Sequence, residues 1–147
     1  MGQQVDLTSL ISKLIREYEQ TYGEMVFAFQ KINGKFIYTY INDRLLKAAH
    51  LQEQDVMGKG LDNLNIGSAL AAKLQQIYTK AWGGQEAVYY FIPDTNPEIL
   101  LVIALKPQFE DSQVTEVRGH CAPLRIDEFQ YATELLSSFK PFDSISD

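Results

Sequence analysis

The imidazole and thiol groups of this chain are few. It has two histidines, His50 and His120, and one cysteine, Cys121. Histidine and cysteine side chains together are typical ligands of zinc. His120 and Cys121 are neighbours in a predicted strand, however, and successive strand residues point to opposite faces of a sheet. The two side chains therefore cannot hold one ion between them, and we predict no metal site.

Carboxylates are numerous, since 19 of the 147 residues are Asp or Glu. Several of them fall in predicted turns and caps, where acidic side chains occur because they accept hydrogen bonds from nearby backbone N–H groups. The segment Gly58-Lys59-Gly60 is too short to be a phosphate-binding loop, and no predicted strand precedes it. A nucleophile elbow and a His-Glu metal motif are also absent. We therefore predict no catalytic residues and a protein that is not an enzyme.

Aromatic side chains offer a different chemistry, that of an apolar binding pocket. Rings can bury the carbon skeleton of a small amphipathic molecule, while tyrosine hydroxyls fix its polar end. The alternative is a solid core in which the same rings fill the interior, and the sequence leaves both possibilities open. The predicted ligand-binding residues are Phe27, Phe29, Tyr38, Tyr40, Leu61, Leu74, Ile77, Tyr78, Trp82 and Tyr89.

The composition favours one globular domain, with 46% hydrophobic and 22% charged residues. The net charge of −6, without a basic stripe, argues against binding to nucleic acid or to an anionic membrane. No apolar run approaches the roughly 18 residues of a membrane span, and no signal peptide is recognisable. A single cysteine excludes an internal disulfide. We therefore expect a cytoplasmic protein.

Residues 5–22 are predicted to form an amphipathic helix, because apolar residues recur there every three or four positions. This apolar stripe could pack on the chain's own sheet, or it could also contact a second copy of the chain. One stripe on one helix does not separate these possibilities. The predicted homodimer interface consists of Leu7, Leu10, Ile11, Leu14, Ile15 and Tyr18.

β-strands are predicted on both sides of a helical middle. The pair Asn33-Gly34 lies between two aromatic-rich runs, a strong indication of a hairpin over residues 25–41. Three later strands are predicted at residues 86–92, 99–106 and 113–122. Pro107 is predicted to end the second of these strands.

The helical middle is delimited by capping residues. Asn42 or Asp43 should cap a short helix, which short helical turns follow over residues 52–60. A longer helix is predicted for residues 68–82, and another amphipathic helix for residues 126–139. The order of these elements predicts an α+β fold: a five-stranded antiparallel sheet with helices on one face, flanked by N- and C-terminal amphipathic helices.

Short motifs recur in a characteristic order along residues 25–124. The most specific is the run from Gly58-Lys59-Gly60-Leu61 to Leu64. The others are Gly34 with residues 36–41 and Asn42, the pair Leu45-Leu46, residues 78–84, and Val117-Arg118-Gly119. In this order they resemble a PAS domain, the sensory module of histidine kinases and related signalling proteins, whose sheet is profilin-like.

Two features depart from the PAS pattern. The strand between Gly34 and Asn42 is about two residues longer than usual, so the side chains that face inward cannot be assigned from the sequence. The Asp-Ile-Thr ending that is frequent after the last strand is replaced by residues 123–127, Pro-Leu-Arg-Ile-Asp. This replacement leaves open how the C-terminal helix couples to a downstream element.

The resemblance also bears on cofactors. PAS domains that bind haem usually take a histidine from the long helix or close to it, and residues 68–82 contain none. Flavin-binding light sensors of the family need a reactive cysteine in an Asn-Cys-Arg-Phe-Leu-Gln context, which is missing here. We predict neither haem nor flavin, so an unidentified small organic molecule is the remaining type of ligand.

The resemblance implies a cytoplasmic sensory domain in signal transduction. Residues 1–23 would be an N-terminal helix, 24–124 the PAS-like domain, and 125–147 a C-terminal helix with a frayed tail. A ligand or partner in the apolar pocket would act through the terminal helices of a homodimer on an output partner. A longer parent protein, if there is one, could be a histidine kinase of a two-component system. The alternatives are a ligand-free interaction or dimerisation scaffold, roadblock- or longin-like, and a small α+β isomerase or hydrolase.

Overall fold

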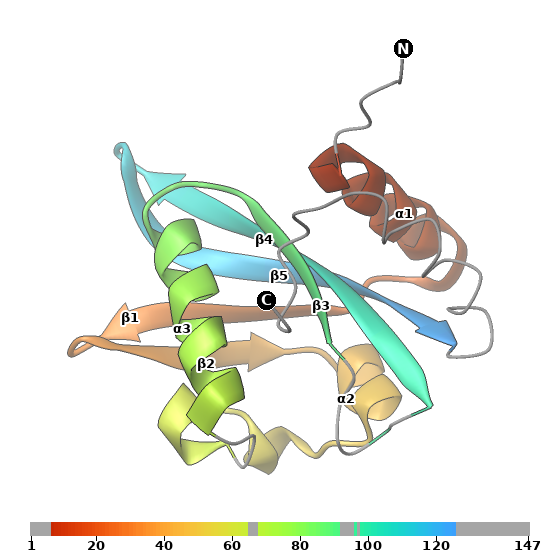
Figure 1. Ribbon diagram of the computed structural model, residues 1–147, viewed down its shortest axis with the longest axis horizontal. Coiled ribbons are helices and arrows are strands. Elements are labelled where there is room, and N and C mark those ends of the chain that lie inside the picture. The colour runs from red at the N-terminus through yellow and green to blue at the C-terminus, as the bar shows by residue number, and fades with distance from the viewer. Residues whose placement is uncertain (1–6, 65–67, 92–95, 97, 126–147) are drawn as a thin grey trace.

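A five-stranded antiparallel sheet forms the centre of the molecule, in the strand order β2-β1-β5-β4-β3 (Figure 1). The structure is a computed structural model that describes residues 7–64, 68–91, 96 and 98–125. The sheet and its helices confirm the predicted α+β fold. In chain order the elements are α1 (Leu7–Tyr22), β1 (Val26–Ile32), β2 (Lys35–Ile41), α2 (Asp43–Ala49), the short 3₁₀ helices η1 (Glu53–Asp55) and η2 (Leu61–Asn63), α3 (Ser68–Trp82), β3 (Ala87–Phe91), β4 (Ile99–Glu110) and β5 (Gln113–Arg125).

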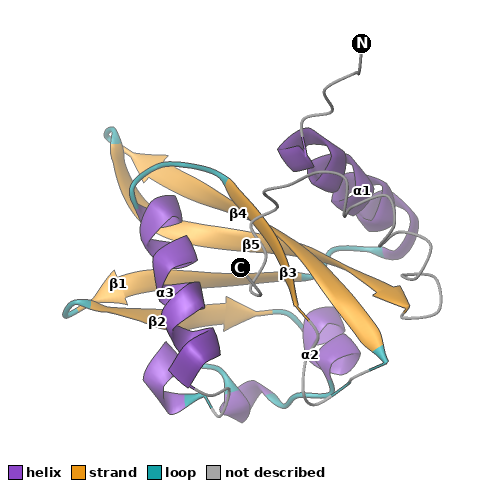
Figure 2. Cartoon of the chain, in the orientation of Figure 1, coloured by secondary structure: helices purple, strands orange, loops and turns teal. Residues whose placement is uncertain are grey.

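Helices lie on both faces of the sheet. On the inner face, α2, α3 and the 3₁₀ helix η2 pack against the strands around one large apolar cluster, whereas α1 lies apart from them (Figure 2). A second, smaller cluster on the outer face joins α1 to β3, β4 and β5. The alternation of strand side chains supplies both clusters, because Cys121 of β5 belongs to the inner one and the adjacent Ala122 to the outer one.

The apolar stripe of α1 packs on the chain's own sheet. Ile11 is 0% exposed and Ile15 is 3% exposed, and both belong to one cluster with apolar side chains of the outer face such as Val102. The simpler of the two interpretations of this helix, packing within the chain, is therefore realised. A contact with a second copy stays a prediction, and the side chains of Leu7 and Leu10 lie outside the described part of the chain.

Predicted turns and caps explain where the elements begin and end. Asn33 and Gly34 both have positive φ, as a tight hairpin turn requires. The side chain of Asn42 accepts hydrogen bonds from the backbone N–H groups of Leu45 and Val26 and donates one to the carbonyl of Glu24. One residue thereby caps α2 and fixes the beginning of β1.

The motif around Gly58 and Gly60 has a structural role. Gly58 donates a backbone hydrogen bond to Tyr38, which in turn donates one to Lys59, so this segment covers the free edge of β2. A side chain at Gly60 would have its Cβ 3.2 Å from the carbonyl oxygen of Phe36. The small residue therefore allows the two backbones to approach, and the motif closes an edge that could otherwise pair with another chain.

Strand β4 runs through Pro107 to Glu110, so the prediction that Pro107 ends this strand was wrong. Pro107 is aligned with Val117 of β5. The pairing of β4 with β3 ends at Leu105, so beyond that residue β4 has β5 as a neighbour on one side only. A proline lacks a backbone donor, and such a one-sided segment of a strand tolerates it.

Two expectations concern parts of the chain that the structure does not describe or test. The helix predicted for residues 126–139 lies outside the described residues, and the division into three segments stays a prediction.

Within the described ranges, no helix has both the length and the apolarity needed to cross a membrane.

Candidate functional site

The inner face of the sheet carries a cluster of aromatic rings. The ring of Phe29 on β1 stacks on that of Tyr78 on α3, with 4.2 Å between the ring centroids. Phe36 of β2 contacts both rings edge-on, and Trp82 lies against Phe36 with 6.1 Å between centroids. This cluster forms because Phe29 and Phe36 point inward from adjacent strands while α3 turns Tyr78 and Trp82 toward them.

Three tyrosine hydroxyls meet inside this apolar cluster. Tyr78 hydrogen bonds to Tyr38 of β2, with 2.7 Å between the hydroxyl oxygens, and also to Tyr89 of β3. Burial is the main cause that raises the pKa of all three phenols well above the usual value. The hydroxyls are therefore neutral near pH 7 and act as hydrogen-bond donors and acceptors, not as acids.

The tyrosine trio, Tyr38, Tyr78 and Tyr89, joins opposite edges of the sheet. Strands β2 and β3 stand at the two ends of the strand order, with β1, β5 and β4 between them. Only a strongly curved sheet can bring side chains from both edges to one residue of α3. The hydrogen bonds of Tyr78 are therefore sensitive to the curvature of the sheet.

The structure brings together nine of the ten residues predicted to bind a ligand. Eight of them belong to the buried inner cluster, and Trp82 packs against it. The exception is Tyr40, whose side chain is 49% exposed. Phe36, which the ten residues did not include, also belongs to the cluster, and its alternation with Tyr38 along β2 is the pattern that would have identified it.

A β-bulge explains the position of Tyr40. Ala28 of β1 is aligned with Tyr40, while the next residue, Phe29, is aligned with Tyr38, so β2 has one extra residue at this point. An extra residue reverses the face on which the following side chains lie. Ile41 therefore enters the inner cluster in place of Tyr40.

His120 and Cys121 lie on opposite faces of β5, as predicted. Cys121 is buried in the inner cluster, and burial, followed by the charge of Glu19, raises the pKa of its thiol. A thiol that stays protonated is a poor nucleophile and a poor metal ligand. His120 lies on the outer face, where its Nδ1 is 2.9 Å from Oε2 of Glu19 on α1.

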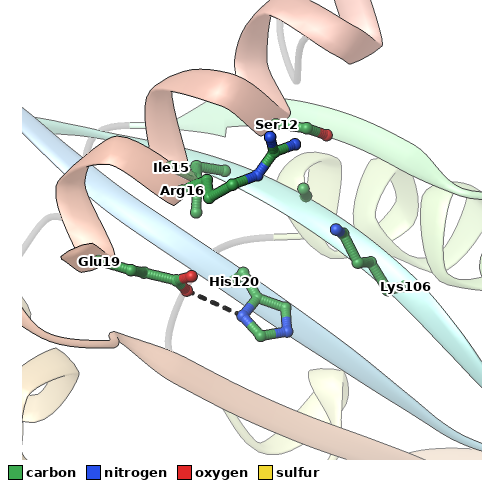
Figure 3. A pocket seen from close by; sticks show the side chains of 7 residues that line it. Ser12, Ile15, Arg16, Glu19, Lys106 and His120 are labelled. Carbon is green, nitrogen blue, oxygen red and sulfur yellow. Dashed lines mark hydrogen bonds and ion pairs between the residues drawn. The ribbon is translucent and has the colours of Figure 1, made fainter.

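A small polar hollow adjoins the Glu19–His120 pair (Figure 3). It has a volume of about 80 Å³ and lies between α1 and strands β4 and β5. Its lining residues are Ser12, Ile15, Arg16, Glu19, Ala104, Lys106 and His120. Sequence reasoning did not find this site, because Glu19 and His120 are 101 positions apart and no local pattern links them.

Comparisons with solved structures show what this arrangement resembles. A Light-Oxygen-Voltage domain studied with a flavin analogue superposes with a TM-score of 0.60 at 12% identity, over 86% of this chain and 93% of that one. A sensory box sensor histidine kinase from Vibrio cholerae gives 0.53 at 9% identity, over 82% and 98%. A variant of Drosophila melanogaster Cycle PAS-B with bound glycerol gives 0.50 at 13%, over 68% and 99%.

Comparisons of the sequence alone found no such likeness. No protein-family model matches this sequence, and no curated protein matches it. At identities of 9–13%, the similarity to the solved structures concerns the fold.

Proposed function

From the premise that this chain has the PAS fold, we propose that it is a sensory domain of signal transduction that binds a small amphipathic ligand at its inner face. The observation that carries this proposal is the tyrosine trio, Tyr38, Tyr78 and Tyr89, a group of neutral hydroxyls inside an apolar cluster. Apolar sites with a few convergent polar groups are the usual form of small-molecule pockets.

Ligand entry would be coupled to movement of α3. The rings of Phe29, Phe36 and Tyr78 are in mutual contact, so a ligand must separate them. A buried hydroxyl left without a partner is costly, so the ligand must replace the hydrogen bonds that it displaces. A ligand that meets both requirements would loosen the link between the two edges of the sheet.

The central strands offer a direct route from the inner face to α1. Ile103 of β4 and Cys121 of β5 belong to the inner cluster, while their neighbours Ala104 and Ala122 pack in the outer cluster with Ile15 of α1. A change in curvature of these strands therefore alters the surface on which α1 rests. A few kcal/mol of preference of the ligand for one arrangement is enough to shift the population.

Transmission of a signal from this domain requires partner proteins. We infer a cytoplasmic homodimer in which the exposed side of α1 contacts a second copy, and an output domain or partner protein, with a histidine kinase as the first candidate. Of the residues predicted for the interface, Leu14 is 37% exposed and Tyr18 is partly buried, whereas Ile11 and Ile15 are covered by the chain's own sheet. Leu14 and Tyr18 are therefore the residues proposed to contact the second copy.

Replacing Leu14 by glutamate should convert the dimer into a monomer, because a charge would have to be buried at the interface. Sedimentation velocity at several protein concentrations measures the change. Gln20→Glu is the matched control, since it adds the same charge at an exposed position on another side of α1. A wild-type protein that is monomeric at every concentration would contradict the dimer.

A ligand-free scaffold is the second candidate function. The close packing of the aromatic rings favours it, because stacked rings that fill the inner face leave the tyrosine trio as a structural element only. The two functions differ in what the purified protein should contain and in the role of the Tyr78 hydroxyl.

Native mass spectrometry of the purified wild-type protein should show a retained small molecule. Tyr78→Phe keeps the ring and removes the central hydroxyl, so the retained fraction should fall by about tenfold, the equivalent of one hydrogen bond. Tyr40→Phe removes a hydroxyl from an exposed tyrosine and should leave the retained fraction unchanged. A wild-type protein that carries no small mass would support the scaffold.

A further inference from the structure

Three potential metal ligands meet where the end of α1 crosses β5. Glu19, Glu24 and His120 each offer one ligand atom, and these atoms all lie within 4.8 Å of one another. We propose that the three residues bind a divalent transition-metal ion such as Zn²⁺. The sequence excluded a metal site that combines His120 with Cys121. Cys121 plays no part in the proposed site, because it lies on the other face of the sheet.

The backbones that carry these ligands are held close to each other. Gly23 ends α1 with a positive φ of 104° and so directs the chain from the helix into β1. The carbonyl of Glu24 then accepts a hydrogen bond of 2.8 Å from the side chain of Asn42. The N–H of Cys121 donates a hydrogen bond of 2.9 Å to the carbonyl of Met25. Met25 follows Glu24, and Cys121 follows His120. This hydrogen bond therefore holds the backbones of Glu24 and His120 near each other.

Small movements would complete the coordination. Ligands of a tetrahedral Zn²⁺ ion, with bonds of about 2.1 Å, lie about 3.4 Å apart. Nδ1 of His120 and Oε2 of Glu19 are already 2.9 Å apart, so an ion needs to widen this pair only slightly. Glu24 is exposed, so its side chain can rotate toward the ion without disturbing the core.

The ligand types select the class of ion. Mg²⁺ and Ca²⁺ prefer oxygen ligands only, whereas an imidazole with carboxylates suits zinc and other first-row transition metals. Two glutamates would balance the two positive charges of the ion. Three protein ligands would leave at least one coordination position for water or a small anion.

Positively charged side chains near the three ligands affect the affinity for a metal ion. Arg16 and Lys106 line the hollow beside the Glu19–His120 pair (Figure 3). Arg16 is exposed, so its charge can turn into solvent, where screening is strong. Arg44 lies against Gly23 and hydrogen bonds to Tyr18. These cations could also attract an anion to the open position of a bound ion.

Calorimetric titration of the metal-free full chain with ZnCl₂ tests the proposal. We expect one ion per chain, and an affinity that falls at least tenfold in Glu24→Gln and in His120→Gln. Glu17→Gln removes the same charge from an exposed position of α1 close to Glu19 and should bind as the wild type does.

A spectroscopic probe identifies the ligands independently. Co²⁺ in place of Zn²⁺ should give visible absorption bands in the wild type, and these bands should change in His120→Gln, which removes the nitrogen ligand. Circular dichroism of each metal-free variant verifies its fold. The absence of saturable binding, or an equal affinity for Zn²⁺ in the wild type, Glu24→Gln and His120→Gln, would overturn the proposal.

Discussion

Replacing Phe29 by alanine is expected to lower the free energy of unfolding by about 3–5 kcal/mol, the range typical of a buried aromatic residue. Phe29 is 0% exposed, and its ring is stacked on Tyr78 and in edge contact with Phe36. Its removal would leave a cavity at the centre of the inner cluster, which the surrounding rings can fill only in part. Urea denaturation followed by circular dichroism measures the loss.

Tyr40→Ala is the matched control for this prediction. Tyr40 is aromatic and lies on the strand next to Phe29, but its side chain is 49% exposed because of the bulge in β2. We expect its replacement to cost well under half as much as that of Phe29, since less apolar surface leaves the interior. Equal losses in the two variants would show that β2 has no bulge and that Tyr40 points inward.

Replacing Gly119 by alanine is expected to destabilise the protein by about 1–3 kcal/mol, the usual cost of overpacking a core. Gly119 of β5 is aligned with Phe27 of β1, and the ring of Phe27 lies directly over the glycine. A Cβ atom at position 119 would overlap this ring, which is itself buried, so Phe27 would have to leave its place. The same denaturation experiment measures the effect.

A second substitution tests the cause of that loss. In the double variant Gly119→Ala with Phe27→Leu, the smaller side chain at position 27 removes the overlap. We expect the two losses to be less than additive, because the alanine then finds space that the ring had occupied. Strict additivity would mean that the glycine is needed for backbone conformation and not to accommodate the ring.

Both substitutions also bear on the proposed sensing role. Phe27 and Phe29 lie on β1, and Gly119 lies on the neighbouring β5, which contributes to both the inner and the outer cluster. If these strands relay a change in curvature, a cavity at Phe29 should weaken the coupling between the inner face and α1. Hydrogen exchange of the α1 amides, compared between the wild type and Phe29→Ala, reports on that coupling.

Local patterns were sufficient to predict most of the elements. Asn33-Gly34 predicted the hairpin, and Asn42 or Asp43 the start of α2, because the backbone requirements of turns and caps are satisfied by neighbouring residues. The order of these elements then restricts the topology, since antiparallel strands pair with few possible connections. The resemblance to PAS domains rested on the same local motifs.

Other features depend on residues that are distant in sequence. The bulge that exposes Tyr40 arises from the pairing of β2 with β1, and the continuation of β4 through Pro107 is possible because β3 ends its pairing early. No local sequence pattern predicts either feature, because each depends on how the neighbouring strand pairs. Composition and spacing alone therefore included Tyr40 among the predicted ligand-binding residues.

The sequence alone was enough to determine the class of fold, the apolar character of the interior and the opposite directions of His120 and Cys121, because strand alternation and chain order decide them. The tertiary structure decided that α1 covers the outer face, that Tyr78 links both edges of the sheet, and that Glu19 and Glu24 meet His120. The physical reason is the curvature of the sheet, which results from all five strands together and brings distant side chains into contact.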